Sequence, residues 1–169
     1  MSRARAVSRV AELGRIVLGP LAGRPDDDWQ RAPAGKWTPA QIVEHLALSF
    51  EFSARGFESA SGAQVRRPKK PLEWISTWFV FGVGWIPPGV RAPRRATPAG
   101  RIEAGDARRH FEDGLARWAA LDGRPAAERN PAVFVHHPRM GDLDQDEWLR
   151  FHLWHCRHHA RQIERRLAG

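Results

Sequence analysis

The sequence predicts an all-α protein, because three features of the chain favour helices over strands. Apolar residues recur at intervals of three and four over residues 3–18, 38–59 and 99–121 and in the last stretch from 148 to 166, which is the spacing of one helix face. Two of these stretches begin with the residues of a capping box. The chain of 169 residues is long enough for one domain with its own core, so we expect a single domain over residues 1–169.

The first expected helix, residues 3–18, ends at Gly19-Pro20. A connection from residue 23 to 37 follows, with the acidic run Asp26–Asp28. Three adjacent aspartates can hold a metal ion. In a turn-rich loop, capping or solvation explains them better, and we expect that role here.

The second expected helix carries a histidine on its apolar face. Thr38 is the expected N-cap, and Gln41 completes the capping box. His45 then lies on the same stripe as Ile42 and Leu46. A lone inward histidine is more often structural than a ligand. A histidine pair on another helix reverses that balance, because buried imidazoles need partners and one metal ion can satisfy all three.

Residues 60–98 are the least regular part of the chain, with a Trp-rich apolar run from 72 to 86 that is too short to span a bilayer. The run could lie in a membrane interface, since basic residues flank it on both sides. We favour a short helix packed over the mouth of the core, because apolar runs of this length more often mark a buried segment. Its tryptophans would then line a pocket or a dimer contact: Trp74, Trp78 and Trp85.

A third helix is expected over residues 99–121, ended by Asp122-Gly123, and it contains His110, to which we assign no role. Residues 124–143 read as a long connection that could bring His136 or His137 near an active site.

The last expected helix, capped by Asp144, contains the strongest site signal. His155 and His159 are one turn apart, roughly 40° around the helix, and can therefore reach one metal ion. His152 lies about 60° from His155. Cys156 projects about 100° away, so we expect a packed core residue there. The stretch alone leaves metal binding and a merely His-rich face equally open, and a third ligand from elsewhere would decide between them.

Composition narrows the function classes. The formal net charge is +8, but the arginines are scattered and no nucleic-acid module is recognisable, so nucleic-acid binding is not expected. The single cysteine excludes an internal disulfide. With no signal-peptide pattern and no transmembrane segment, we expect a cytoplasmic protein.

The helices and their histidines resemble the DinB-like metal-binding four-helix-bundle superfamily. The resemblance is carried by four short runs. They are residues 35–39 (GKWTP), 44–46 (EHL), 155–163 (HCRHHARQI), and 137–143 (HPRMGDL) followed by Glu147-Trp148. The last run is similar to one uncharacterised branch of that superfamily.

This resemblance implies an antiparallel four-helix bundle with a long crossover, often homodimeric. It also implies a divalent metal, such as zinc, nickel, iron or cobalt, held by His45, His155 and His159. His152 or Gln162 could orient a ligand or a bound water from behind, and His152 is an alternative ligand. Characterised members include enzymes that transfer low-molecular-weight thiols such as bacillithiol, and mycothiol-dependent isomerases.

Three functional hypotheses follow. The leading one is a metal-dependent transferase or hydrolase acting on a small electrophile, with a low-molecular-weight thiol as cosubstrate. The alternative is a non-catalytic, metal-stabilised binding module with an apolar Trp-lined pocket. A bundle that holds no metal is the third. A catalytic ion keeps an open coordination position, whereas a structural ion is closed by a fourth protein ligand.

Overall fold

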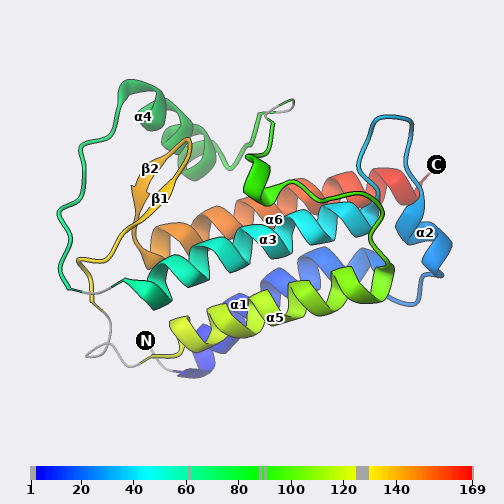
Figure 1. The fold of residues 1–169 in the computed structure, drawn as a ribbon, viewed down its shortest axis with the longest axis horizontal. Coiled ribbons are helices and arrows are strands. Elements are labelled where there is room, and N and C mark those ends of the chain that lie inside the picture. The colour runs from blue at the N-terminus through cyan, green and yellow to red at the C-terminus, as the bar shows by residue number, and fades with distance from the viewer. Residues whose placement is uncertain (1–2, 61, 88, 90, 125–129, 169) are drawn as a thin grey trace.

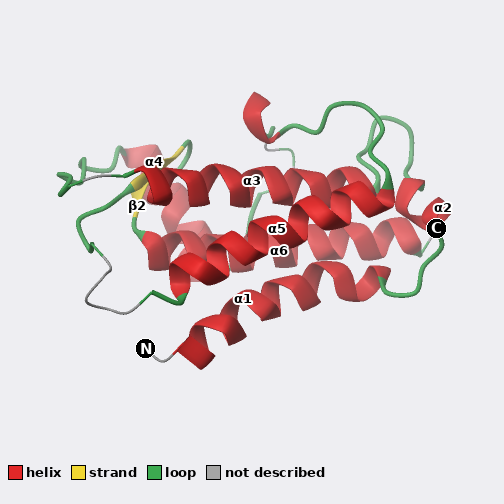
Figure 2. Cartoon of the chain, turned by 60° about the horizontal axis from the view of Figure 1, so that its bottom comes forward, coloured by secondary structure: helices red, strands yellow, loops and turns green. Residues whose placement is uncertain are grey.

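Four long helices make up most of the protein (Figure 1). The computed structural model describes residues 3–60, 62–87, 89, 91–124 and 130–168, with side chains from Arg9 onward. The long helices are α1 (Arg3–Leu18), α3 (Pro39–Ser59), α5 (Ala104–Asp122) and α6 (Gln145–Leu167). α1 and α3 each pack against both α5 and α6, so the four helices enclose a common interior (Figures 1 and 2). The predicted all-α class is confirmed in that the described chain is mainly helical.

The two expected capping boxes are both present. Thr38 accepts a hydrogen bond from the backbone N–H of Gln41 at 3.2 Å, and the Gln41 side chain accepts one from the Thr38 N–H at 3.0 Å. Asp144 and Glu147 make the same reciprocal pair at 2.8 and 3.0 Å. These caps satisfy N–H groups that have no partner within the helix, and they fix the residues at which α3 and α6 begin.

The interior is filled by aromatic and aliphatic side chains from all four long helices. α3 and α5 approach closely where Gly114 faces Phe50, since a Cβ on Gly114 would lie 3.0 Å from the Phe50 Cβ. Beside this contact, the indole N–H of Trp118 donates to the Phe50 carbonyl and to the Ser53 hydroxyl, each at 3.2 Å. The largest fully buried residues are Trp29, Phe50, Phe111, Trp118 and Trp148.

A short helix and a two-stranded hairpin lie in segments that the sequence assigned to loops. Residues 26–30 form α2 (Asp26–Gln30), where buried Asp28 pairs with Arg24 at 3.4 Å and Arg31 at 3.0 Å. Strands β1 (Val135–His137) and β2 (Gly141–Leu143) form an antiparallel hairpin within the predicted long connection. Strands of three residues are too short to produce a detectable alternation of polar and apolar residues.

The third long helix begins later than expected. Residues 99–103 are not helical, and α5 starts at Ala104. The segment is held by two glutamine side chains, which donate at 2.7 Å each: Gln41 to the Gly100 carbonyl and Gln30 to the Ile102 carbonyl. Gly100 has φ +67°, a left-handed conformation that a continuing helix excludes. Long-range hydrogen bonds therefore override the local helix-start signal.

The Trp-rich run forms the expected short helix, but not in the expected place. α4 (Pro71–Thr77) continues into π-helical turns, η2 (Trp78–Val83). Of these residues Val80 is buried, whereas Trp74 and Trp78 are 62% and 61% exposed, so the expectation that the helix covers the core with these rings is wrong. Trp74 and Trp78 do line a shallow hollow, and a dimer contact there stays a prediction. In the described part of the chain, no helix is both long and apolar enough to cross a membrane. Short 3₁₀ turns, η1 (Gly19–Leu21) and η3 (Arg94–Ala96), complete the fold.

Candidate metal centre

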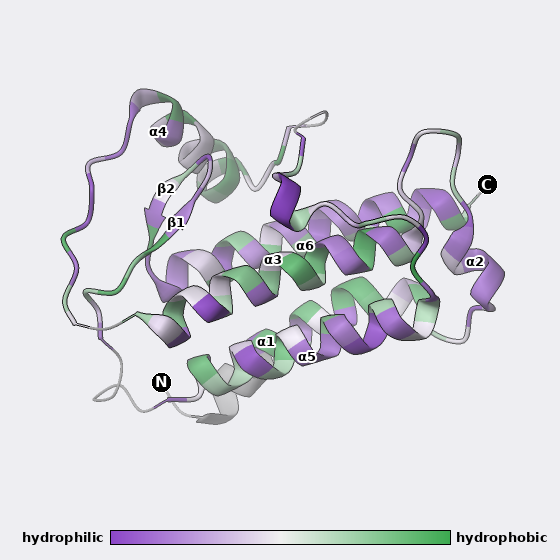
Figure 3. Ribbon diagram, viewed as in Figure 1, coloured by the Kyte–Doolittle hydropathy of each residue, from purple (hydrophilic) through white to green (hydrophobic). Residues whose placement is uncertain are grey.

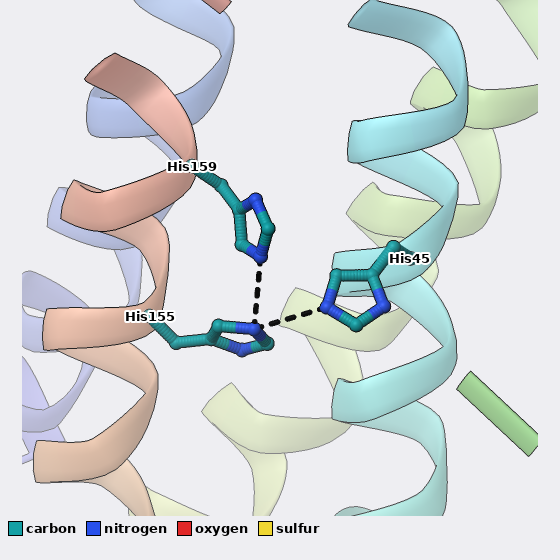
Figure 4. A group of neighbouring side chains, drawn as sticks. All are labelled: His45, His155 and His159. Atoms are coloured by element: carbon teal, nitrogen blue, oxygen red, sulfur yellow. Dashed lines mark hydrogen bonds between the residues drawn. The ribbon is translucent and has the colours of Figure 1, made fainter. Parts of the chain in front are cut away.

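His45 is presented by α3 and held from behind by the backbone of η3. The Thr38 cap sets the start of α3, and two turns later His45 points between α3 and α6 (Figure 4). Its Nδ1 lies 2.5 Å from the Ala96 carbonyl oxygen. A carbonyl only accepts hydrogen bonds, so Nδ1 carries the proton and Nε2 is left with a lone pair. The Trp37 ring packs beside His45, with ring centroids 5.0 Å apart.

His155 and His159 come from successive turns of α6, as their spacing predicts. Their ring centroids are 4.7 Å apart. The Nδ1 of His159 lies 3.0 Å from the Gln162 amide oxygen, so this nitrogen also carries the proton and the His159 Nε2 is left with a lone pair. The amide nitrogen of Gln162 in turn donates to His158 Nε2 at 2.9 Å, which fixes the orientation of the amide.

The three imidazoles converge through their Nε2 atoms (Figure 4). His155 Nε2 lies 3.0 Å from that of His45 and 3.1 Å from that of His159. The three donor atoms all lie within 4.8 Å of one another, and among the described residues these three form the group of His, Cys, Asp and Glu that can hold a metal ion. Residues that are 110 positions apart in the sequence therefore share one point of the interior.

Hydrogen bonds among the three rings leave one Nε2 lone pair without a donor. Two of the three Nε2 atoms are lone-pair acceptors, and both face His155 Nε2. A proton on that nitrogen can point at one acceptor but leaves the other unsatisfied. The remaining His155 nitrogen, Nδ1, is buried and has no hydrogen-bond partner among the described residues. A metal ion at the centre would take all three lone pairs at once.

Burial keeps these rings neutral, which is the form that binds metals. His45, His155 and His159 are 5%, 8% and 7% exposed. Loss of solvation lowers the pKa of all three imidazoles, and repulsion between the ring charges adds to the effect for His155 and His159. The backbone hydrogen bond to Ala96 opposes part of the lowering of the His45 pKa.

The spacing of the donors also fits a metal ion. Two nitrogen ligands at about 2.05 Å from a tetrahedral ion lie about 3.3 Å apart. Two of the three separations, at 3.0 and 3.1 Å, are a few tenths of an ångström shorter. The third lies within the 4.8 Å limit of the group, so binding one ion would require small movements of the rings. Since the metal-compatible group contains three residues, an ion held by it would keep a coordination position for water or substrate.

The other residues that the sequence suggested as metal ligands lie outside the group of three histidines. His152 is fully buried one turn before His155, but its Nε2 is 2.9 Å from the Ser53 hydroxyl and its ring stacks on Phe50 at 4.0 Å. The free thiol of Cys156 is buried in the core, and burial raises its pKa well above the ordinary value. Neither residue belongs to the convergent group.

The histidines of the hairpin are near the centre but do not reach it. The His137 ring packs on Phe151 at 4.4 Å, and Phe151 packs on His155 at 4.9 Å. His136 instead pairs with Asp142 at 3.1 Å. His137 therefore lies one aromatic layer behind the metal-compatible group.

Three neighbours of the centre were not found by sequence reasoning: the Trp37 ring, the Phe151 ring and the Ala96 carbonyl. Trp37 directly precedes the predicted cap, and Phe151 is four residues before His155 on α6, so helix geometry could have suggested Phe151. The Ala96 carbonyl had no sequence signal, because any residue supplies one.

Glu44 and His110 form a separate pair between α3 and α5. His110 Nδ1 lies 3.0 Å from both Glu44 carboxylate oxygens, and His110 Nε2 lies 3.5 Å from Glu51. Glu44 adjoins His45 in sequence but contacts a different helix. His110, which received no role from the sequence, links α3 to α5.

Comparisons with known proteins identify the family but no activity. The chain belongs to the family described as "Protein of unknown function" (DUF1569), which matches residues 27–166. No curated protein and no protein of solved structure matches the chain. The matched range contains all three convergent histidines.

Proposed function

We propose that this protein is a metal-dependent enzyme, a transferase or hydrolase, that acts on a small electrophilic substrate. The observation that carries the proposal is the convergence of three Nε2 lone pairs, from His45, His155 and His159, within 4.8 Å and with no fourth protein ligand in the described group. Three nitrogen ligands with an open position are typical of catalytic rather than structural zinc sites.

Three histidines would hold the metal ion, and neighbouring residues would orient these ligands. Ala96 and Gln162 keep two of the imidazoles in the tautomer that directs Nε2 inward. Because the three imidazoles are neutral, they leave the full charge of a divalent ion uncompensated. When bound, such an ion lowers the pKa of a coordinated water or thiol toward neutrality and so supplies a nucleophile. Trp37 and Phe151 flank the ligands and limit the access of bulk water.

A low-molecular-weight thiol is the cosubstrate we infer, from the resemblance to the DinB-like superfamily. The same resemblance leads us to propose that the four long helices are its antiparallel bundle, with the segment between α3 and α5 as the long crossover. The contacts of each long helix with two others support this arrangement. Zinc, nickel, iron and cobalt all suit three imidazole ligands.

A non-catalytic, metal-stabilised module is the second candidate. The observation that favours it is the burial of the centre, since no ligand ring is more than 8% exposed. A bound ion would then lock α3 to α6, and a stability gain on metal binding without turnover is its expected signature.

The deciding experiment measures metal content first and activity second. Elemental analysis of protein purified without an affinity tag should give about one divalent metal per chain. Transfer of thiols to model electrophiles should then require that metal and stop on its removal. No metal after reconstitution rejects the site. Bound metal without metal-dependent turnover selects the second candidate.

A further inference from the structure

The outer face of α4 and η2 is apolar and uncovered. In the described part of the chain, the large apolar side chains classed as exposed all fall between residues 65 and 85. Four residues line a shallow apolar hollow there: Trp74, Ile75, Trp78 and Phe79. In Figure 3 the hydrophobic colour gathers on the turns that follow α4, at the edge of the molecule away from α1 and α5. We call the exposed set the Trp surface: Leu72, Trp74, Ile75, Trp78, Val83 and Trp85.

The opposite face of the same helix is polar and points toward the protein. The Thr77 hydroxyl donates to the Glu73 carbonyl at 2.7 Å and accepts from Lys69 Nζ at 3.3 Å. Lys69 also donates to the Met140 carbonyl at 2.6 Å, in the turn of the β hairpin. The amphipathic pattern of α4 is therefore inverted relative to a helix that packs on a core in water.

Local contacts hold the segment in this orientation. Arg150 on α6 donates to the Phe81 carbonyl at 2.6 Å. Gly84, with φ +70°, lies so close to Trp154 that a Cβ there would be 2.5 Å from the ring. Val80 is buried against the rest of the protein. Because the inner face is anchored, the outward direction of the tryptophans is built into the fold.

Basic residues flank the Trp surface in the sequence. Residues 62–96 contain seven Lys and Arg and one Glu, a formal net charge of +6 within the +8 of the whole chain. Arg66 and Arg67 pair with Glu147 and Asp142, while Lys70 and Arg139 are exposed at the start of α4 and in the hairpin turn that contacts Lys69. A surface that combines exposed tryptophan with basic residues matches the chemistry of an anionic lipid headgroup layer.

We propose that the Trp surface docks into the interface of an anionic phospholipid bilayer. The segment would lie in the plane of the membrane, because its 13 helical residues (Pro71–Val83) are too few to cross it. The tryptophan and aliphatic side chains enter the headgroup region, and the flanking lysine and arginine side chains contact lipid phosphates.

Charge argues against a second copy of the chain, and the aliphatic side chains argue against a nucleic acid. A second copy of the chain on the same face would bring two regions of the same positive sign together, which repel each other even though Arg66 and Arg67 are paired with carboxylates. A nucleic acid would suit the charge and could stack its bases on the exposed tryptophans, but it would leave the aliphatic side chains of Leu72, Ile75 and Val83 without an apolar partner. Lipid chains and headgroups match both the aliphatic and the basic parts of the surface.

Vesicle co-sedimentation tests the proposal directly. The full chain should bind phosphatidylcholine vesicles containing about 30% phosphatidylserine, with a blue shift of tryptophan emission, and should bind pure phosphatidylcholine vesicles much more weakly. The double variant Trp74→Ser/Trp78→Ser should lose at least about tenfold in partitioning while its Tm stays unchanged.

A matched pair of charge variants shows whether binding depends on the position of the basic residues or only on the net charge of the protein. Lys70→Ser/Arg139→Ser should weaken binding by up to about fivefold per charge removed. Arg109→Ser/Arg117→Ser removes the same charge from exposed positions on α5, on the far side of the molecule (Figure 1), and should bind like the wild type. An equal loss of vesicle binding in both double variants would show that the attraction is non-specific, and it would overturn the proposal.

Other outcomes also overturn it. Concentration-dependent dimerisation that disappears in Trp74→Ser/Trp78→Ser, without vesicle binding, would assign the surface to a second copy. Binding of single-stranded oligonucleotides in place of vesicles would assign it to nucleic acid. None of these results depends on whether the histidine centre holds a metal.

Discussion

The histidine centre and the Trp surface are opposites in how they place polar and apolar groups. The centre buries three imidazoles among helices, whereas α4 exposes tryptophans and turns Thr77 toward the protein. Both arrangements cost free energy in an isolated chain in water, because buried polar groups lose solvation and exposed apolar groups remain hydrated. In each region the proposed partner would remove that cost: a cation at the centre, and a lipid interface at the surface.

The two regions are also connected through one stretch of backbone. The segment that begins at α4 ends in η3, and the Ala96 carbonyl of η3 holds the His45 ring. An apolar surface and a metal-compatible site therefore occupy the two ends of the same connection between α3 and α5. In both regions, a departure from the usual inside-outside pattern coincides with the site of a proposed partner.

The largest effect is expected at the centre itself. His155→Ala removes the ligand that contacts both other imidazoles, and we expect metal affinity to fall by more than the roughly 100-fold that loss of a supporting residue causes. Competition with a chromogenic chelator measures the affinity. His110→Ala, on the α3–α5 contact, serves as the control and should retain metal. Equal losses in the two variants would undo the assignment of the ligands.

Substitutions of core and surface aromatic residues should differ sharply in their effect on the free energy of unfolding. Phe50→Ala opens a cavity beside Phe111 and the His152 ring and should cost about 3–5 kcal/mol in the free energy of unfolding. Trp74→Ala removes an exposed ring and should change it by less than about 0.5 kcal/mol. Urea denaturation measures both. A large loss for Trp74→Ala would mean that the Trp surface is part of the core.

A smaller effect is expected from the residue behind His159. Gln162→Leu keeps the size of the side chain but removes the acceptor for His159 Nδ1, so the ring can adopt the other tautomer. Metal affinity should fall by about 10–100-fold without loss of the site. Gln162→Glu, which keeps an acceptor, should retain more affinity than Gln162→Leu. The reverse order would show that Gln162 does not act through the His159 proton.

The last prediction concerns pH. Burial, with repulsion from neighbouring basic groups, lowers the pKa of His137 to about 3. The unfolded chain binds the proton near pH 6.5, so stability from this group is full above pH 6.5 and is lost as the pH falls toward 3. The slope is at most about 1.4 kcal/mol per pH unit. His137→Gln should unfold with a shallower pH dependence between pH 7 and 5. An unchanged slope would contradict the lowered pKa of His137 in the folded protein.

Local sequence signals located most of the helical framework. The capping boxes at Thr38 and Asp144 gave the starts of α3 and α6, and the His155–His159 spacing gave the shared face. The late start of α5 was missed because glutamines from α2 and α3 pin the carbonyls of Gly100 and Ile102. Such side-chain contacts link residues 59 and 72 positions apart, and no local pattern reports them.

The amino-acid sequence alone determined that the protein is mainly helical, and it singled out His45, His155 and His159 as residues that could share a metal ion. Helix periodicity and capping are local, so they can be read along the chain. Only the tertiary structure decided that the three Nε2 atoms meet, that His152 turns to Ser53 instead, and that the tryptophans of α4 face outward. Those outcomes depend on the packing of segments far apart in sequence, where the direction of each side chain is set by its neighbours in space.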